Sequence, residues 1–128
     1  MTALLDLHPD TGHPVLAGVA EMHQVLDRMH AASPAGVTQH GFAVGEVERA
    51  IRRLESLKLN LVAAADKAGT AKDAGYCGTD AWVARHTTTS RATAAREVAL
   101  ATDLDTGHDT TATALDAGAL SPAHAAVI

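Results

Sequence analysis

Alanine dominates this sequence and aromatic residues are nearly absent, which constrains the possible folds more than any other feature. The 128-residue chain contains 28 Ala but only one Trp, one Tyr and one Phe. Alanine is the strongest helix former, whereas aromatic side chains favour strands. Because small side chains fill little space, helices that meet through alanine must approach one another closely. The composition therefore predicts an all-α protein, of a length typical of one domain or a piece of one.

Charge is distributed unevenly along the chain. The formal net charge is −5, yet residues 46–101 carry nine Lys and Arg against seven Asp and Glu, a local balance of +2. The total charge argues against a protein that coats nucleic acid through bulk positive charge. The more basic centre still permits a modest DNA contact by a single helix.

Several other classes are disfavoured by the sequence. Cys77 is the only cysteine, so neither an intrachain disulfide nor a cysteine-rich zinc site is possible. The first residues lack the basic region and apolar stretch of a signal peptide. The longest clean apolar run, residues 61–65, is far too short to span a membrane. We therefore expect a cytoplasmic protein without membrane contact.

Apolar periodicity and capping residues divide the chain into helices. Residues 1–13 are interpreted as a flexible lead-in, and residues 14–128 as a single helical domain with a long amphipathic helix and a compact cluster. The predicted helices cover approximately 14–32, 44–68, 80–87, 91–103 and 110–117. Thr79, Ser90 and Asp109 are the predicted N-caps of the last three.

A further helix is predicted to begin at Ser121-Pro122, a cap followed by a first-turn proline. The sequence ends at Ile128, an apolar residue a few positions into that helix. We therefore expect the chain to be a fragment, truncated at its C-terminal end.

The predicted helix 44–68 carries an apolar stripe that needs a partner. Its members recur at helical spacing and are Val44, Val47, Ile51, Leu54, Leu61, Val62 and Ala65. Packing inside the chain is the commonest use of such a stripe. Pairing with the first helix, or with the same helix of a second chain in a homodimer, is the alternative.

Residues with catalytic or metal-binding potential do not assemble into a recognisable site. His23, Asp27 and His30 share one flank of the first helix, a spacing that permits a metal, but no further ligand can be identified. Cys77 is expected to be a small buried side chain rather than a reactive thiol. Glycine-rich phosphate loops are absent. We expect no catalytic residue, no metal and no cofactor in this chain.

Residues 79–103 have the organisation of a helix-turn-helix. Two short helices flank Thr87-Thr88-Thr89-Ser90, and in that motif the start of the second helix faces the bases of DNA. Ser, Thr and Arg side chains are all capable of contacting DNA. Trp82 is predicted to anchor the pair against Ala94 and Val98. A plain helical hairpin with no DNA contact is the alternative. The candidate DNA-contact residues are Arg85, Ser90, Arg91, Thr93 and Arg96.

Four segments occur together in the order of a known family. They are residues 61–69, residues 74–85 around Tyr76 and Trp82, residues 90–96, and residues 114–128 with Gly118-Ala-Leu-Ser. The series resembles domain of unknown function 222, an N-terminal helical domain of high-GC bacteria. The resemblance implies a C-terminal HNH endonuclease in many members and a repeat family linked to mobile elements. It covers the second half of the chain well and the first sixty residues loosely.

The chain departs from that family in two respects. Thr88-Thr89 replaces the usual Gly-Leu before the capping serine, which predicts a strained or altered turn, because Cβ opposes left-handed geometry. The paired histidines and asparagine of an HNH site are also missing, since Asn60 is the only asparagine. No nuclease residue is carried over, and a divalent metal is expected only for an HNH domain outside this chain.

Residues 90–91 and 118–126 are also similar to the helix-turn-helix region of chromosome-partition DNA-binding proteins, whose Ser-Arg helix is the recognition helix. Together these patterns predict an accessory helical domain that positions an HNH nuclease on double-stranded DNA. The alternative is a protein-interaction or dimerisation module with no DNA contact.

Overall fold

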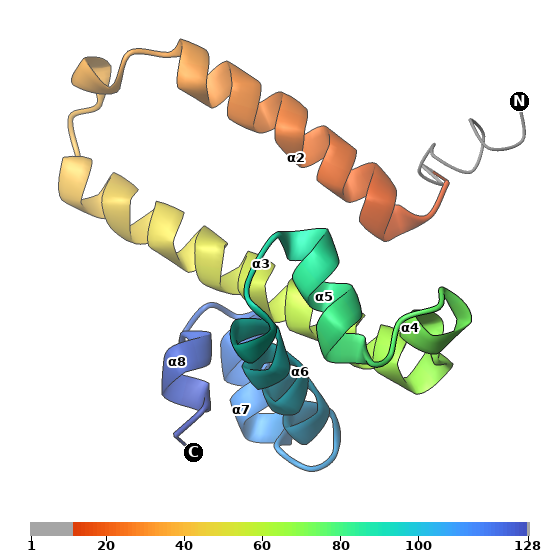
Figure 1. Ribbon diagram of the computed structural model, residues 1–128. Coiled ribbons are helices and arrows are strands. Elements are labelled where there is room, and N and C mark those ends of the chain that lie inside the picture. Colours follow the sequence, from red (N-terminus) through yellow and green to blue (C-terminus); the bar gives the residue numbers. More distant parts are fainter. Residues whose placement is uncertain (1–11, 128) are drawn as a thin grey trace, which may run out of the picture. The chain divides into compact units, whose positions relative to one another are not determined.

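The computed structural model describes residues 12–127, and every regular element in that range is helical (Figure 1). The all-α prediction is therefore confirmed. Apart from Gly12 and His13, the predicted lead-in 1–13 lies outside the described residues. The chain divides into two compact units after His40. None of the described helices has the length and apolarity needed to cross a membrane.

The first unit contains α2 (Pro14–Ala31) and a 3-10 turn, η1 (Pro34–Gly36). The predicted helix 14–32 is thus confirmed to within one residue. The structure adds its N-cap, because Nδ1 of His13 accepts a hydrogen bond from the Val15 N–H at 3.1 Å. No α2 side chain is buried, although the helix is amphipathic.

The second unit is built on α3 (His40–Ala68), which begins four residues before the predicted start at Val44. Gly41 and Gly45 are poor helix formers, yet the helix runs through both of them. It stops where predicted, because Gly69 takes a left-handed conformation with φ 70°. A one-turn helix that the sequence did not predict, α4 (Thr70–Asp73), follows at once.

Four further helices gather along α3 (Figure 1). They are α5 (Thr79–Thr87), α6 (Arg91–Asp105), α7 (Asp109–Asp116) and α8 (Pro122–Ala125). The buried cluster consists of Leu59, Val62 and Ala63 from α3, Val83 from α5, and Ala94 and Ala101 from α6. Ala94 is fully buried and Ala101 is 2% exposed, so α6 meets its neighbours through methyl groups. The close helix packing expected from the alanine content is found between α5 and α6.

Two of the predicted caps are one residue out of place. The N-cap of α5 is Gly78 rather than Thr79, whose hydroxyl instead donates to Oδ1 of Asp66 at 2.6 Å. The N-cap of α7 is His108, and Asp109 is the first helical residue, where a carboxylate still favours the helix dipole. The predicted caps at Ser90 and Ser121 are confirmed by hydrogen bonds from Thr93 N–H and His124 N–H.

Two arginines of α3 hold the C-terminal end of α7. Nε of Arg49 donates to the carbonyl of Ala117 at 3.1 Å, and Nε of Arg53 donates to the carbonyl of Asp116 at 3.2 Å. These carbonyls lie where a helix leaves acceptors unpaired and its dipole is negative. Ser56, one turn further along α3, donates to the carboxylate of Asp116. We call these three α3 residues the α7 clasp.

The clasp requires glycine at position 118. Gly118 ends α7 with φ +77°, and a Cβ there would lie 2.8 Å from the carbonyl oxygen of Arg49 and 2.7 Å from its Cγ. A backbone atom cannot move aside as a flexible side chain can. The glycine therefore provides both the left-handed turn and the close approach of this turn to α3.

Replacing Gly118 with alanine should destabilise the fold much more than the same change at Gly69. Both residues have positive φ, which costs an alanine about 1 kcal/mol. Only Gly118 adds a clash with α3, so we expect a total loss of roughly 2–4 kcal/mol there. Urea unfolding of Gly118→Ala and Gly69→Ala would measure both values. Equal losses would contradict the proposed close approach.

Candidate nucleic-acid interface

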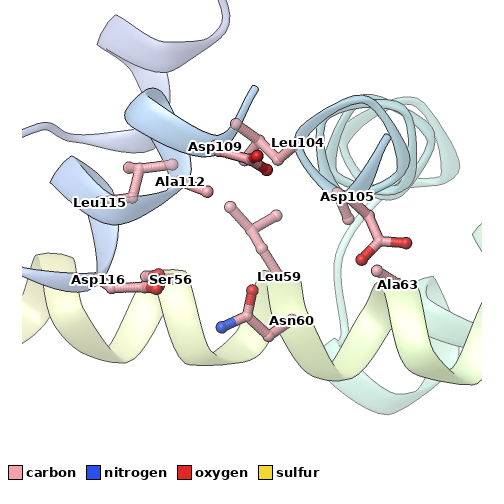
Figure 2. Close-up of a pocket in the computed structure, with 11 residues that line it drawn as sticks. Ser56, Leu59, Asn60, Ala63, Leu104, Asp105, Asp109, Ala112, Leu115 and Asp116 are labelled. Carbon is pink, nitrogen blue, oxygen red and sulfur yellow. Dashed lines mark hydrogen bonds between the residues drawn. The ribbon is translucent and has the colours of Figure 1, made fainter. Parts of the chain in front are cut away.

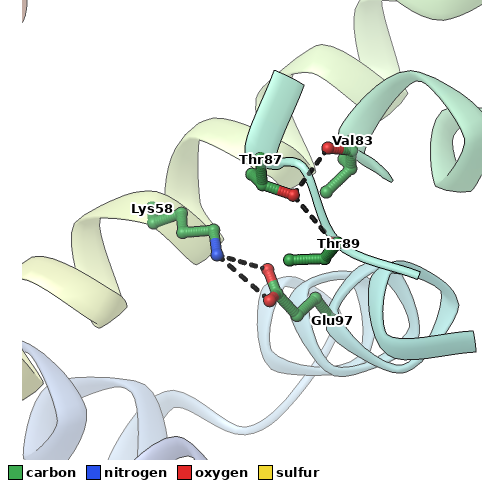
Figure 3. Close-up of polar contacts among 5 residues, drawn as sticks. All are labelled: Lys58, Val83, Thr87, Thr89 and Glu97. Atoms are coloured by element: carbon green, nitrogen blue, oxygen red, sulfur yellow. Dashed lines mark hydrogen bonds and ion pairs between the residues drawn. The ribbon is translucent and has the colours of Figure 1, made fainter. Parts of the chain in front are cut away.

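The turn between α5 and α6 is built from the threonines that the sequence places there. The hydroxyl of Thr87 donates to the carbonyl of Val83 at 2.8 Å and lies 2.9 Å from the hydroxyl of Thr89 (Figure 3). Between them Thr88 has φ 54° and ψ 44°, the left-handed conformation. No other non-glycine residue in the described range has a positive φ. The predicted strain is thus found at Thr88.

Glycine at position 88 should stabilise the protein. A β-branched residue is disfavoured in the left-handed region, whereas glycine adopts it freely. The gain is partly offset by the greater entropy of glycine in the unfolded chain, so we expect Thr88→Gly to add about 0.5–1 kcal/mol. Thr88→Ala keeps the Cβ and should yield less than half of that gain. Urea unfolding of the two variants tests the strain, and equal stabilities would contradict it.

The N-cap and first two turns of α6 carry three of the candidate DNA-contact residues in one hydrogen-bonded group. Ser90 caps the helix by accepting from the Thr93 N–H at 3.1 Å, and its hydroxyl lies 3.0 Å from that of Thr93. Arg96 donates to the Thr93 hydroxyl at 3.3 Å. Ser90 and Arg96 are exposed, and Thr93 is half-buried. These three residues therefore share one surface at the start of the helix.

Arg91 has a partner that the sequence did not reveal. Its guanidinium lies 3.2 Å from Oδ2 of Asp80 on α5 and 3.7 Å from Sγ of the exposed Cys77. The Ala81 N–H and then the Arg91 guanidinium hold the pKa of Asp80 below its ordinary value. The same carboxylate raises the pKa of Arg91. An eleven-residue separation between partners on two helices leaves no periodic signal in the sequence.

Cys77 corrects one expectation. The sequence predicts a small buried thiol at this position, but the residue is exposed beside Arg91. It precedes α5 in the irregular segment that follows α4, where no helix face is available to bury it.

The Asp80–Arg91 ion pair should make stability depend on pH in acid. Because the folded pKa of Asp80 is depressed, its contribution is complete above the ordinary carboxylate pKa. It is lost as the pH falls through the lowered folded value, below about pH 4. The stability difference between the wild type and Asp80→Asn should therefore be constant near neutrality and shrink below that pH.

Thermal melts of both proteins across that range provide the measurement. Asp73→Asn removes an exposed carboxylate from α4 rather than the ion-pair partner of Arg91, and serves as the control. A difference between wild type and Asp80→Asn that persisted unchanged at about pH 2 would contradict the stabilising role of the ion pair.

The remaining predicted residues lie on α5. Arg85 is exposed near the end of the helix. Trp82 packs against the buried cluster that contains Ala94, with Val98 packing against the same cluster, but its side chain is only half-buried. Its ring lies 4.8 Å from that of His86, whose Nδ1 is 2.9 Å from the Trp82 carbonyl. The tryptophan thus contacts the core from its edge rather than filling its centre.

Ion pairs hold α6 against α3 from both sides. Nζ of Lys58 lies 2.8 and 3.0 Å from the two carboxylate oxygens of Glu97 (Figure 3). Nζ of Lys67 lies 2.5 Å from a carboxylate oxygen of Asp105. Within α3, Arg52 also pairs with Glu48 one turn earlier, at 3.4 Å. Much of the positive charge of α3 is therefore used in ion pairs with carboxylates of the same chain.

A cavity of about 190 Å³ opens between α3, α6 and α7 (Figure 2). Leu59, Ala63 and Leu115 form its apolar wall, and three aspartates line it together with Ser56 and Asn60. Two of the aspartates, Asp105 and Asp116, already contact Lys67 and Ser56. The negative lining makes this side of the unit unfavourable for a nucleic acid.

Within residues 12–127 no three His, Cys, Asp or Glu side chains are grouped closely enough to hold a metal ion. His23, Asp27 and His30 all lie on exposed positions of α2. The predicted DNA-contact residues that the structure brings together lie at the start of α6, which is the candidate surface.

The fold and this surface define a small all-helical domain with a tightly packed α5–α6 pair. A family model described as domain of unknown function 222 matches residues 42–128, more than half of the chain. The chain belongs to that family. The match begins close to the division between the two units and extends further toward the N-terminus than the four resembling segments. No curated protein and no solved structure matches the chain.

Proposed function

We propose that this domain is an accessory module of an HNH-endonuclease family protein and contacts double-stranded DNA through the start of α6. The α5–α6 pair acts as a helix-turn-helix, with α6 entering the major groove by its first two turns. The candidate contacts are Ser90, Arg91, Thr93 and Arg96 on α6, with Arg85 on α5 near the phosphate backbone.

The observation that carries the proposal is the different use of the arginines on α3 and α6. Arg49 and Arg53 are also exposed, but each donates its Nε–H to a carbonyl at the end of α7. Arg91 keeps 62% of its side chain exposed despite its pairing with Asp80, and Arg96 is exposed as well. The α6 start is thus a basic surface on which guanidinium groups remain accessible to phosphate or to a guanine edge.

The connection between the two helices supports the same proposal. It comprises Thr88, Thr89 and Ser90, with a left-handed residue first and an N-cap last. This length is that of the turn in helix-turn-helix motifs. The Ser90 cap fixes where α6 begins, and it therefore also fixes which side chains its first turn presents.

Asp80 gives the proposal a directional test. Its carboxylate competes with DNA for Arg91, so Asp80→Asn should strengthen binding by several-fold. The double variant Arg91→Ala plus Arg96→Ala should weaken binding at least about tenfold and reduce the slope of log affinity against log salt by about 2. A gel-shift titration with a labelled duplex of mixed sequence at several salt concentrations measures both.

A matched control removes the same charge elsewhere. Arg28→Ala plus Lys72→Ala deletes two exposed cations, on α2 and α4, and should leave the affinity nearly unchanged. Equal losses of DNA affinity in the two double variants would show that only the net charge matters. That result would overturn the assignment to α6. A wild-type chain that fails to shift the duplex at low salt would overturn DNA contact altogether.

A further inference from the structure

Residues 44–61 of α3 carry an apolar surface that is separate from the buried face of the helix. The α3 stripe, as used below, consists of five residues that are 39–69% exposed: Val44, Val47, Ile51, Leu54 and Leu61. The buried residues of α3 are Ser56, Leu59, Val62 and Ala63. Leu59, Val62 and Ala63 take part in the core of the second unit, and none of the five stripe residues belongs to that core.

The spacing of the α3 stripe is that of a coiled-coil seam. Successive members are separated by three, four, three and seven residues, and Lys58 occupies the position that completes the last interval. Alternation of three and four is the 3.5-residue period that keeps one seam facing a second helix. The seam from Val44 to Leu61 is roughly 25 Å long, at 1.5 Å per residue.

The residue types along the seam favour two parallel strands. In heptad terms Val44 and Ile51 occupy position a, while Val47, Leu54 and Leu61 occupy position d. Parallel dimers prefer β-branched residues at a and leucine at d, and leucine occupies two of the three d positions here. Lys58 is a polar residue at a, which limits the number of strands, and Glu97 of its own chain already compensates its charge.

The charges beside the seam select the same orientation. Glu48 and Glu55 occupy the e positions, and Ala50 and Leu57 occupy g. In a parallel pair e faces g of the other strand, so each glutamate meets an uncharged side chain. In an antiparallel pair e faces e, and glutamates would oppose one another. The flanks thus disfavour antiparallel self-pairing and permit the parallel arrangement.

From these observations we infer that the α3 stripe binds the α3 stripe of a second copy of this chain, in parallel and about a two-fold axis. The interface is short, so the dimer dissociates on dilution. This inference goes beyond DNA contact and does not depend on it. Its test measures self-association in the absence of DNA, so either idea can fail while the other stands.

Sedimentation of the 128-residue chain over a dilution series tests the dimer. We expect a concentration-dependent dimer, and Ile51→Glu should raise its dissociation constant at least about tenfold by placing two charges in one seam layer. Ile51 is 43% exposed, so this variant should keep its helical circular-dichroism spectrum and cooperative melt. Ala99→Glu adds the same charge at an exposed position of α6 and should leave the dimer intact.

Cysteine cross-linking tests the orientation. In a Cys77→Ser background, Val44→Cys should form a disulfide-linked dimer with oxidised glutathione, because equivalent residues adjoin only in a parallel pair. A mixture of Val44→Cys and Leu61→Cys chains should not cross-link with one another. Cross-linking in that mixture alone would overturn the parallel arrangement.

A chain that stays monomeric at all concentrations would overturn the inference and leave the stripe to another helix, from this chain or from a different protein. A dimer that survives Ile51→Glu would place the interface elsewhere and overturn it equally.

Discussion

The packing of alanine methyl groups between α6 and its neighbours is the constraint on which the second unit depends. Ala94 and Ala101 are almost completely buried, and they face a cluster that includes Leu59, Val62 and Ala63 of α3. The small side chains of α6 allow α5 and α6 to approach closely, so that many weak dispersion contacts replace a few large side chains. Val83 and Leu115 are the largest side chains buried to this extent in the described range.

Charged side chains add contacts between the helices that the small apolar core does not provide. Lys58 and Lys67 join α3 to α6, while Arg49 and Arg53 end on carbonyls of α7. The arginine contacts are electrostatically favourable, because the C-terminal end of a helix presents unpaired acceptors and the negative end of the helix dipole. The locally basic centre of the sequence is therefore in large part structural. The cations that remain accessible on the α5–α6 pair are the ones that the DNA proposal uses.

Helix positions were predictable from the sequence wherever a local signal defined them. Pro14, Ser90 and Ser121-Pro122 each begin a helix as predicted, because capping and first-turn chemistry act within a few residues. The errors at Thr79 and Asp109 share a cause. Each residue could cap by its own chemistry, but its neighbour adopted the non-helical backbone, and Thr79 found a tertiary partner in Asp66. The early start of α3 at His40 likewise overrides two glycines.

At the candidate DNA-contact surface, some features follow from the sequence and others only from the tertiary structure. The sequence by itself determined the all-helical class, the family, the Ser90 cap and the backbone strain at Thr88. Each of these depends on composition, on the order of short segments or on a single dihedral preference. Only the tertiary structure decided that Arg91 pairs with Asp80, that Trp82 is half-buried, and that the stripe of α3 stays exposed while another face of the same helix enters the core. Those outcomes depend on which helix faces meet, and a face is chosen by the packing of residues far apart in the chain.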